Sequence, residues 1–264
     1  MSRGGPSRRR GGGAGRAPGG GLGGGQIEGR RAVEELLAAR RRRVRDVWVA
    51  EGSDPSPALE RIVALASSAR VPVRWVGRAQ IEREAWTDSH QGVLAHADEV
   101  PDADLDELAA SPEAFLVALE GVTDPHNVGA VMRSAECAGA TGIILARHRA
   151  VGITPTVAKA AAGAVEHLPM AVVPGIPGAL QSLARAGVWT VGLDVSARAS
   201  LFDLELADRP VALVLGAEDR GLSRLARTRC DLLVSIPRHG ALGSLNVSAA
   251  AALACFEVAR RRHP

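Results

Sequence analysis

Hydrophobic residues in the second half of the chain come in short continuous runs rather than in alternation with polar ones. Such strands are buried on both faces, which is typical of a parallel sheet covered by helices. The runs are AFLVALEG, GIILA, MAVV, VWTVGLD, VALVLG and DLLVSIP, and stretches with helical periodicity separate them. Residues 114–264 are therefore predicted to form an α/β domain whose ligands bind at the carboxyl ends of the strands.

The last predicted helix has an unusual pattern. From Leu245 to Phe256 it contains no charged residue, and a helix that is apolar all round is normally buried all round. Its entrance carries Ser244, Asn246 and Ser248. The pattern predicts that the end of the chain packs against protein on several sides.

Residues 26–98 are predicted to form a smaller α/β module. A helix over 29–43 places Val33, Leu36 and Leu37 on one face, and a strand, a second helix and two further strands follow. Residues 99–113 are acidic and contain two prolines, which indicates a linker between two domains.

Two clusters of arginine stand out, because the formal net charge of the whole chain is only +3. Residues 1–25 combine arginine with glycine, and we expect a disordered tail that holds phosphates loosely or has no role. The second cluster ends the first helix, where five cations exceed what a helix C-terminus needs. We predict that this cluster contacts an RNA backbone. It consists of Arg40, Arg41, Arg42, Arg43 and Arg45.

Several kinds of site lack a signature in the sequence. Cys137, Cys230 and Cys255 form no CxxC pair, which indicates reduced thiols in a cytoplasmic protein and no zinc site. No apolar run has the length of a membrane span. No GxGxxG fingerprint lies between a predicted strand and a predicted helix, and neither a P-loop nor a nucleophile elbow is present. We therefore expect no metal and no membrane partner.

Glycines and polar residues gather at the ends of three predicted strands. Asn127 and Arg133 follow the first strand, and Gly216 and Glu218 follow another. The third stretch runs from an Ile-Pro pair to SLNVS at 244–248. Each stretch also has a purely structural reading, since an amide or a hydroxyl can cap a helix and a glycine can serve a turn.

Taken together, these stretches resemble the three motifs of the SpoU-type (TrmH-like) RNA 2′-O-methyltransferases. The first motif corresponds to NVGA with Arg133, the second to GAE with Gly221, and the third to Ile236-Pro237 with SLNVS. The resemblance extends over residues 26–262. The stretches AKAAAGAVEHLPM and HQGVLA further resemble the branch that methylates a guanosine of large-subunit ribosomal RNA.

The resemblance implies a fold and an assembly. The C-terminal domain would be a Rossmann-like parallel sheet whose carboxyl end is threaded into a deep trefoil knot, a rare exception to ordinary connection rules. The front module is similar to the RNA-binding domain of that branch. A homodimer is also implied, and the uncharged last helix would pack within it.

The resemblance implies S-adenosylmethionine as the methyl donor, with no metal. Backbone groups around Leu193, Gly216, Ile236 and Leu245 would hold this cofactor, because tight glycine-bearing loops allow close approach. The protein then needs to align a ribose 2′-hydroxyl with the methyl group and to exclude water.

The resemblance gives Arg133 the central catalytic role. Because a guanidinium is essentially never deprotonated in proteins, we expect Arg133 to clamp a phosphate and leave the acceptor of the 2′-hydroxyl proton open. Asn127, Glu218, Ser244 and Asn246 would orient the ribose and hold the loops.

Two alternatives stay open. One is the same chemistry on transfer RNA or on a ribosomal site that confers antibiotic resistance. The other is a catalytically silent RNA-binding or assembly protein, which the presence of Asn127, Arg133 and Asn246 disfavours. Nothing in the chain reads a base directly, so the RNA target rests on resemblance alone.

The remaining candidates receive structural readings. Trp48, Trp75, Trp86 and Trp189 are dispersed along the chain and lack the close spacing of a base-stacking platform, so we expect them in the core or between domains. Lys159, the only lysine, is expected at a solvated helix position, with an RNA phosphate as its alternative partner.

Overall fold

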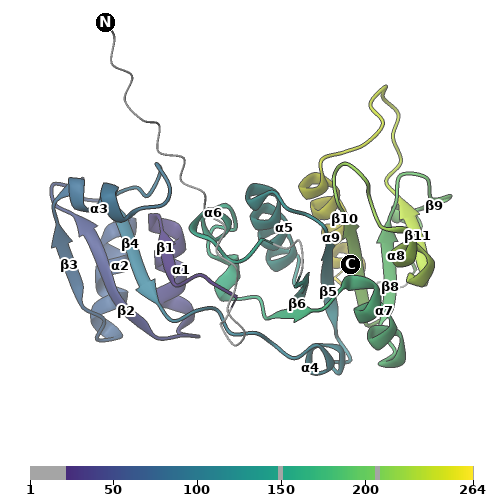
Figure 1. Ribbon diagram of the computed structural model, residues 1–264, viewed down its shortest axis with the longest axis horizontal. Helices are drawn as coiled ribbons and strands as arrows, with labels where there is room; N and C mark the ends of the chain where they lie inside the picture. The colour runs from purple at the N-terminus through teal and green to yellow at the C-terminus, as the bar shows by residue number, and fades with distance from the viewer. Residues whose placement is uncertain (1–21, 148–150, 206–208, 264) are drawn as a thin grey trace, which may run out of the picture.

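The computed structural model describes residues 22–147, 151–205 and 209–263. Two sheets lie side by side in the described part of the chain (Figure 1). A four-stranded sheet has the order β1-β4-β2-β3, and a seven-stranded sheet has the order β7-β6-β5-β10-β8-β11-β9. The α/β class and the smaller N-terminal unit are thereby confirmed.

The N-terminal unit packs two helices against one face of its sheet. Its elements are β1 (Gln26–Glu28), α1 (Arg30–Ala39), β2 (Val44–Ala50), α2 (Pro57–Ser68), β3 (Val73–Val76), α3 (Arg78–Glu84) and β4 (Val93–Ala97). α1 buries Val33, Leu36 and Leu37, the face that its periodicity predicts. β1 and α3 were not predicted, because three residues show no period and α3 buries only Ile81.

The C-terminal unit is built on strands that pair in parallel throughout. Its strands are β5 (Phe115–Glu120), β6 (Gly142–Ala146), β7 (Met170–Val173), β8 (Trp189–Leu193), β9 (Ala199–Ser200), β10 (Val211–Gly216) and β11 (Leu232–Ser235). Its helices are α5 (Pro125–Cys137), α6 (Pro155–Ala160), α7 (Ile176–Arg185), α8 (Arg224–Arg229) and α9 (Val247–Arg262). Short 3₁₀ turns lie at η1 (Ala164–Glu166) and η2 (Leu201–Asp203).

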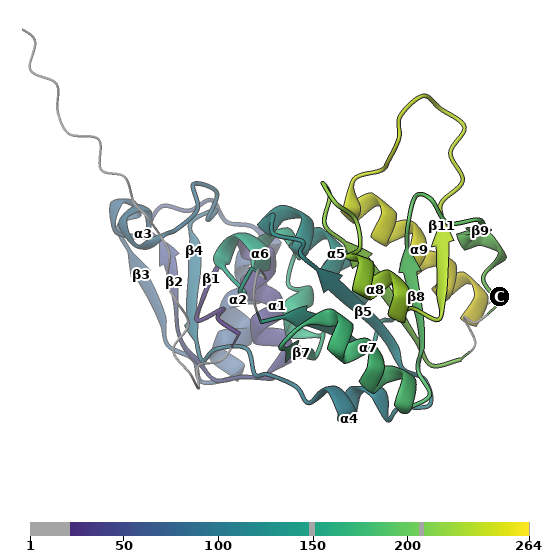
Figure 2. The ribbon, with the colours of Figure 1, turned by 45° about the vertical axis from the view of Figure 1, so that its right-hand side comes forward.

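Helices cover both faces of the larger sheet. One hydrophobic cluster joins the sheet to α5, α6 and α9 and continues into α1 and α2 of the N-terminal unit. A second cluster joins the opposite face to α4 (Leu105–Ala109), α7 and α8. Figure 2 shows α7 and α8 on the side of the sheet away from α9. The apolar strands are buried on both faces, which is why their sequences do not alternate.

α9 is only partly covered within one chain. It packs along α5 and buries Ala251, Cys255 and Val258. Leu253 and Phe256 on its other side are 42% and 51% exposed. The absence of charge from Leu245 to Phe256 would suit a segment enclosed on every side. Within a single chain, however, one side of α9 is exposed to solvent.

The connections between the two units are ordered. Within residues 99–113, α4 packs Ala109 into the second hydrophobic cluster, and Asp102 accepts a hydrogen bond from the Val172 amide (2.9 Å). Leu22, in the expected disordered tail, is instead buried. Its amide donates to the Val100 carbonyl (3.0 Å), and its carbonyl accepts from Ile153 (2.9 Å). Residues 1–21 of that tail lie outside the described residues.

A buried ion pair joins the two units at their centre. The side chains of Arg42 and Glu166 are 3% and 2% exposed, and their Nη2 and Oε1 atoms lie 2.6 Å apart. A second bond joins Arg42 Nε to Glu166 Oε2 (2.9 Å), and Nη1 donates to the carbonyls of Gly24 and Asp98. Arg42 is thus fully occupied and buried, so the prediction that it binds RNA is corrected.

The neighbouring arginines remain on the surface. Arg41 donates to the Glu166 carbonyl (3.2 Å), Arg40 to Ser68 Oγ (3.0 Å) and Arg45 to the Ala97 carbonyl (2.9 Å). Arg43 is exposed. These four can still face a polyanion, and their RNA contact stays a prediction.

Arg42→Ala is expected to lower the free energy of unfolding by about 3 kcal/mol or more, because it leaves the Glu166 carboxylate buried without its cation. Arg43→Ala, one position away and exposed, is the matched control and should change stability by less than about 0.5 kcal/mol. Urea unfolding followed by circular dichroism measures both. Equal effects of the two substitutions would contradict a structural role specific to Arg42.

Candidate active site

A cavity of about 490 Å³ opens at the carboxyl ends of β8, β10 and β11. Leu193, Gly216, Ile236 and Leu245 all line it, so the structure brings together the four residues expected to hold a cofactor. Its volume lies within the range of ligand pockets, roughly 300–1,000 Å³. The cavity therefore occupies the edge of the sheet at which such folds bind ligands.

Gly216 sets the shape of the cavity at the end of β10. The turn that follows β10 folds back so closely that a Cβ at this position would lie 2.1 Å from the carbonyl carbon of Gly221. Gly221 itself has a φ of 64°, in the left-handed region that favours glycine. The GAEDRG turn thus depends on two glycines, and it holds Glu218 at the rim.

Three polar side chains from distant parts of the chain meet beside the cavity. Glu218 accepts hydrogen bonds from the side-chain amides of Asn127 and Asn246. Asn246 Nδ2 also donates to Asn127 Oδ1 (3.1 Å). The three strand-end motifs therefore converge on one hydrogen-bonded cluster, here named the Glu218 cluster after its shared acceptor.

Local helix starts position both amides. Asp124 caps α5 by accepting from the His126 amide (2.9 Å) and also accepts from Asn127 Nδ2 (3.0 Å). Asn246 caps α9, because its Oδ1 accepts from the Ser248 amide (2.8 Å). The capping role and the site role of Asn246 coexist, since its oxygen serves the helix and its Nδ2 reaches the cluster.

The charge of Glu218 is not neutralised by the groups that hold it. Both donors to Glu218 are neutral amides. Three arginines line the cavity: Arg238 donates to the Val195 carbonyl (3.2 Å), and the other two pair with carboxylates. Arg227 pairs with Asp194 (2.7 Å), and Arg220 pairs with Asp219 (3.1 Å). A negative charge thus faces the cavity rim, and it favours a ligand that carries a positive centre.

The structure separates Arg133 from this cluster. Ser244 lines the cavity, but Arg133 lies on another side of α5, six residues after Asn127. It is exposed and lines a second cleft of about 820 Å³ with Arg31 and His167, between α1, α5 and η1. Within a single chain, therefore, Glu218 and Ser244 line the cavity, Asn127 and Asn246 bond to Glu218 beside it, and Arg133 lies elsewhere.

Sequence reasoning missed Asp194. Its side chain is 6% exposed, and it holds Arg227 in an ion pair (2.7 Å) at the cavity wall. It also accepts from the amide and the hydroxyl of Ser196 (2.8 and 2.6 Å), which fixes the turn after β8. An acid directly after a buried apolar run was the available signal.

Lys159 also differs from its expected solvated position. Its ammonium contacts the carbonyl and hydroxyl oxygens of Ser89 in the N-terminal unit, and burial there lowers its pKa. In the part of the chain that the structure describes, no group of three or more His, Cys, Asp or Glu residues could hold a metal ion. No helix among the described residues has the length and apolarity to cross a membrane.

Comparison with known families matches both units. Residues 114–256 match the SpoU rRNA methylase family. Residues 26–103 match a family described as RNA 2′-O ribose methyltransferase substrate binding. The two matches divide the chain at the same place as the two sheets.

Individual relatives cover nearly the whole chain. A putative TrmH family tRNA/rRNA methyltransferase from Bacillus subtilis is 38% identical over 90% of this chain and 96% of its own. The 23S rRNA (guanosine-2′-O-)-methyltransferase RlmB of Pseudomonas putida is 39% identical with the same coverage of both chains. Among solved structures, the SpoU methyltransferase AviRb from Streptomyces viridochromogenes in complex with AdoMet has a TM-score of 0.76. It is 26% identical and covers 90% of this chain and 89% of its own.

Asn246→Ala is expected to lower the free energy of unfolding by about 1 kcal/mol, because α9 loses its N-cap. Asn246→Ser keeps a capping oxygen and should recover most of that loss while still removing the amide that reaches Glu218. Thermal and urea unfolding of the two variants separate the roles. If the serine variant is as unstable as the alanine variant, the capping account is wrong.

Proposed function

Since the chain belongs to the SpoU rRNA methylase family and is an S-adenosylmethionine-dependent RNA 2′-O-methyltransferase, we propose that its substrate is a guanosine of 23S ribosomal RNA. The proposal is supported by the relatives that carry this specificity in their names and align over both units. It also places the protein in the cytoplasm, where that substrate is made. Convergence of the three motifs beside one cavity is the observation that carries the activity.

The residues of the cavity fit S-adenosylmethionine, which supplies a methyl group already activated on a positively charged sulfonium. Leu193, Ile236 and Leu245 offer apolar walls, and the glycine turn after β10 exposes backbone groups. The unneutralised carboxylate of Glu218 at the rim favours the positive charge. The cations on the cavity wall already have partners, because Arg220 and Arg227 pair with Asp219 and Asp194 and Arg238 donates to the Val195 carbonyl.

We assign the Glu218 cluster to the ribose. Two amides hold the carboxylate in one conformation. Its free lone pairs can then accept hydrogen bonds from ribose hydroxyls without a further loss of side-chain freedom. Ser244 and Asn246 lie on the segment between β11 and α9, which borders the same cavity. These side chains would bring the 2′-oxygen in line with the methyl group and keep water out.

Arg133 would act on the phosphate beside the target ribose, and a second copy of the chain would bring it there. Asn127 and Arg133 sit on different sides of α5, and within one chain Arg133 lines the second cleft rather than the cavity. α9 lies along α5 and exposes an apolar stripe of Ala249, Leu253 and Phe256. We propose a homodimer that covers this stripe and places Arg133 of one protomer at the cavity of its partner.

The proposed trefoil knot rests on the family and on the path of the C-terminus. After β11 the chain makes a long connection over residues 236–246 and then returns along α5 as α9 (Figure 2). The polar start of α9 thereby reaches the cluster formed by two earlier segments. Threading of the last segment through a loop would account for an uncharged helix with few water-facing positions.

Arg133→Ala is expected to lower kcat for methyl transfer to 23S ribosomal RNA by about 100-fold, because the reacting phosphate and ribose lose their alignment. The dissociation constant for S-adenosylmethionine should stay within several-fold, since Arg133 would contact the RNA phosphate and not the cofactor. Arg31→Ala, which lines the same cleft but pairs with Glu35, is the control. Labelled-methyl transfer measures kcat, and calorimetry measures the dissociation constant of the cofactor. Mapping of 2′-O-methyl positions identifies the RNA target, and methylation of transfer RNA instead of 23S RNA would refute the proposed target.

Phe256→Glu is expected to convert the dimer to monomers and to abolish activity, because it places a charge in the proposed interface. Leu225→Glu on α8 is the matched control, since both side chains are 51% exposed. Sedimentation velocity reports the state of assembly. A mixture of inactive Arg133→Ala and Glu218→Gln proteins should recover activity through mixed dimers, and a mixture that stays inactive would show that Arg133 does not serve the partner.

A further inference from the structure

Trp86 is a large aromatic side chain that the fold leaves in solvent. It is 72% exposed and lies in the loop of residues 85–92 between α3 and β4. The expectation that the tryptophans pack in the core or between domains therefore fails most clearly for Trp86, and it also fails for Trp75 and Trp189, which are 51% and 38% exposed. A single exposed apolar residue is common on protein surfaces, so its meaning depends on how it is held.

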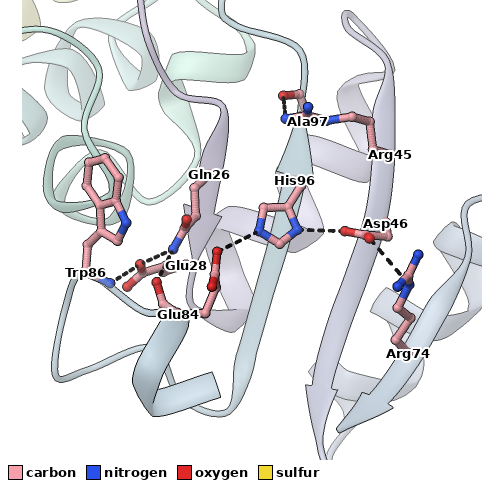
Figure 3. Close-up of polar contacts among 9 residues, drawn as sticks. All are labelled: Gln26, Glu28, Arg45, Asp46, Arg74, Glu84, Trp86, His96 and Ala97. Carbon is pink, nitrogen blue, oxygen red and sulfur yellow. Dashed lines mark hydrogen bonds and ion pairs between the residues drawn. The ribbon is translucent and has the colours of Figure 1, made fainter. Parts of the chain in front are cut away.

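A buried carboxylate fixes the backbone at Trp86. Glu28 on β1 is fully buried and accepts from the amides of Trp86 (2.7 Å) and Thr87 (3.0 Å), and from the Thr87 hydroxyl (2.5 Å). Gln26 Nε2 donates to the same carboxylate (2.9 Å). Figure 3 shows the bonds from Gln26 and the Trp86 amide to Glu28, with the indole ring directed away from the carboxylate. Burial of a carboxylate is costly. Here the buried carboxylate of Glu28 orders a loop whose tryptophan side chain faces water.

Two cations hold the far side of the same loop. Arg30 Nε donates to the Gln91 carbonyl (3.3 Å), and Lys159 reaches across from α6 to Ser89. The acceptors of these bonds are neutral oxygens, and the loop itself carries the exposed Asp88. The loop is thus held at both ends and has two cations on one side that can meet a phosphate backbone.

The loop shares an edge of the molecule with the cavity. In Figure 1, α3 and the loop that follows it lie along the upper edge, as does the long connection between β11 and α9. Figure 2 shows the same arrangement after rotation, with α6 between the two. An RNA strand laid along this edge would meet the loop before it reaches the catalytic unit.

We propose that Trp86 is a stacking platform for an unpaired base of the RNA substrate, at a nucleotide away from the methylated one. This inference rests on the proposed function, because it takes RNA as the ligand. Every base has a flat face, so a rigid, exposed indole accepts bases without reading their sequence. A preordered loop avoids the entropy cost of immobilising the ring on binding. The flanking Arg30 and Lys159 would face the phosphates on either side of the stacked base.

The test compares Trp86→Ala with Trp75→Ala in the full-length protein. Trp75 lies in the same unit on β3, at the edge of the sheet farther from the catalytic unit, and is 51% exposed. The probes are a mixed-sequence single-stranded oligoribonucleotide and a fully paired RNA duplex. Trp86→Ala should weaken single-strand binding about tenfold and leave duplex binding unchanged, whereas Trp75→Ala should change neither.

Further measurements separate stacking from charge and from folding. The loss should be the same at low and high salt, because stacking releases no counterions. Trp86→Phe should restore most of the affinity, and the KM for 23S ribosomal RNA should rise in Trp86→Ala with kcat unchanged. Thermal unfolding and cofactor affinity should match those of the unsubstituted protein.

Several results would overturn the inference. Wild-type affinity in Trp86→Ala, equal losses for single strand and duplex, or altered assembly without altered RNA binding would each exclude a stacking role. The last would indicate that Trp86 docks onto protein. If the unsubstituted protein methylates 23S RNA while Trp86→Ala binds it normally, only this inference fails; if the unsubstituted protein methylates no RNA, the proposed function fails.

Discussion

The site depends on one shared hydrogen-bond acceptor, the carboxylate of Glu218. Its two amide donors, Asn127 and Asn246, are 91 and 28 residues away in sequence. Only a parallel sheet with its carboxyl ends at one edge can bring these segments together. Because the donors are neutral, no cation offsets the carboxylate, and the cavity beside it favours a cationic ligand.

A second constraint is the rigid junction between the two units. Arg42 is buried against Glu166, and Gly163 approaches α1 so closely that a Cβ would lie 2.4 Å from the Cβ of Glu35. One hydrophobic cluster extends across the junction. RNA held by the N-terminal unit would thus be presented at a fixed distance and angle to the catalytic edge. A flexible tether would instead have to meet the entropy cost of alignment at each turnover.

The sequence predicted the large elements well because their signals are long. Five or six consecutive apolar residues indicate a buried strand or part of a buried helix. Once the strands are placed, the residues at their carboxyl ends can be predicted as well. Short elements such as β1, α3 and α4 have too few residues to show a period. Arg42 and Arg43 are chemically identical, so no local pattern could show that only Arg42 is buried. The exposure of Trp86 depends on Glu28, which lies 58 residues away and gives no local signal.

Arg133 shows why a site can be complete in sequence and incomplete in one chain. Its motif places it on the same helix as Asn127, but six residues of α-helix turn it through well over a full turn to another face. The proposed dimer would bring it back. Arg133 of one protomer would clamp the RNA phosphate at its partner's cavity, while Glu218 there favours the cationic cofactor. Two opposite charges in one site would then serve a cation and a polyanion at adjacent positions, and assembly would be a condition of catalysis.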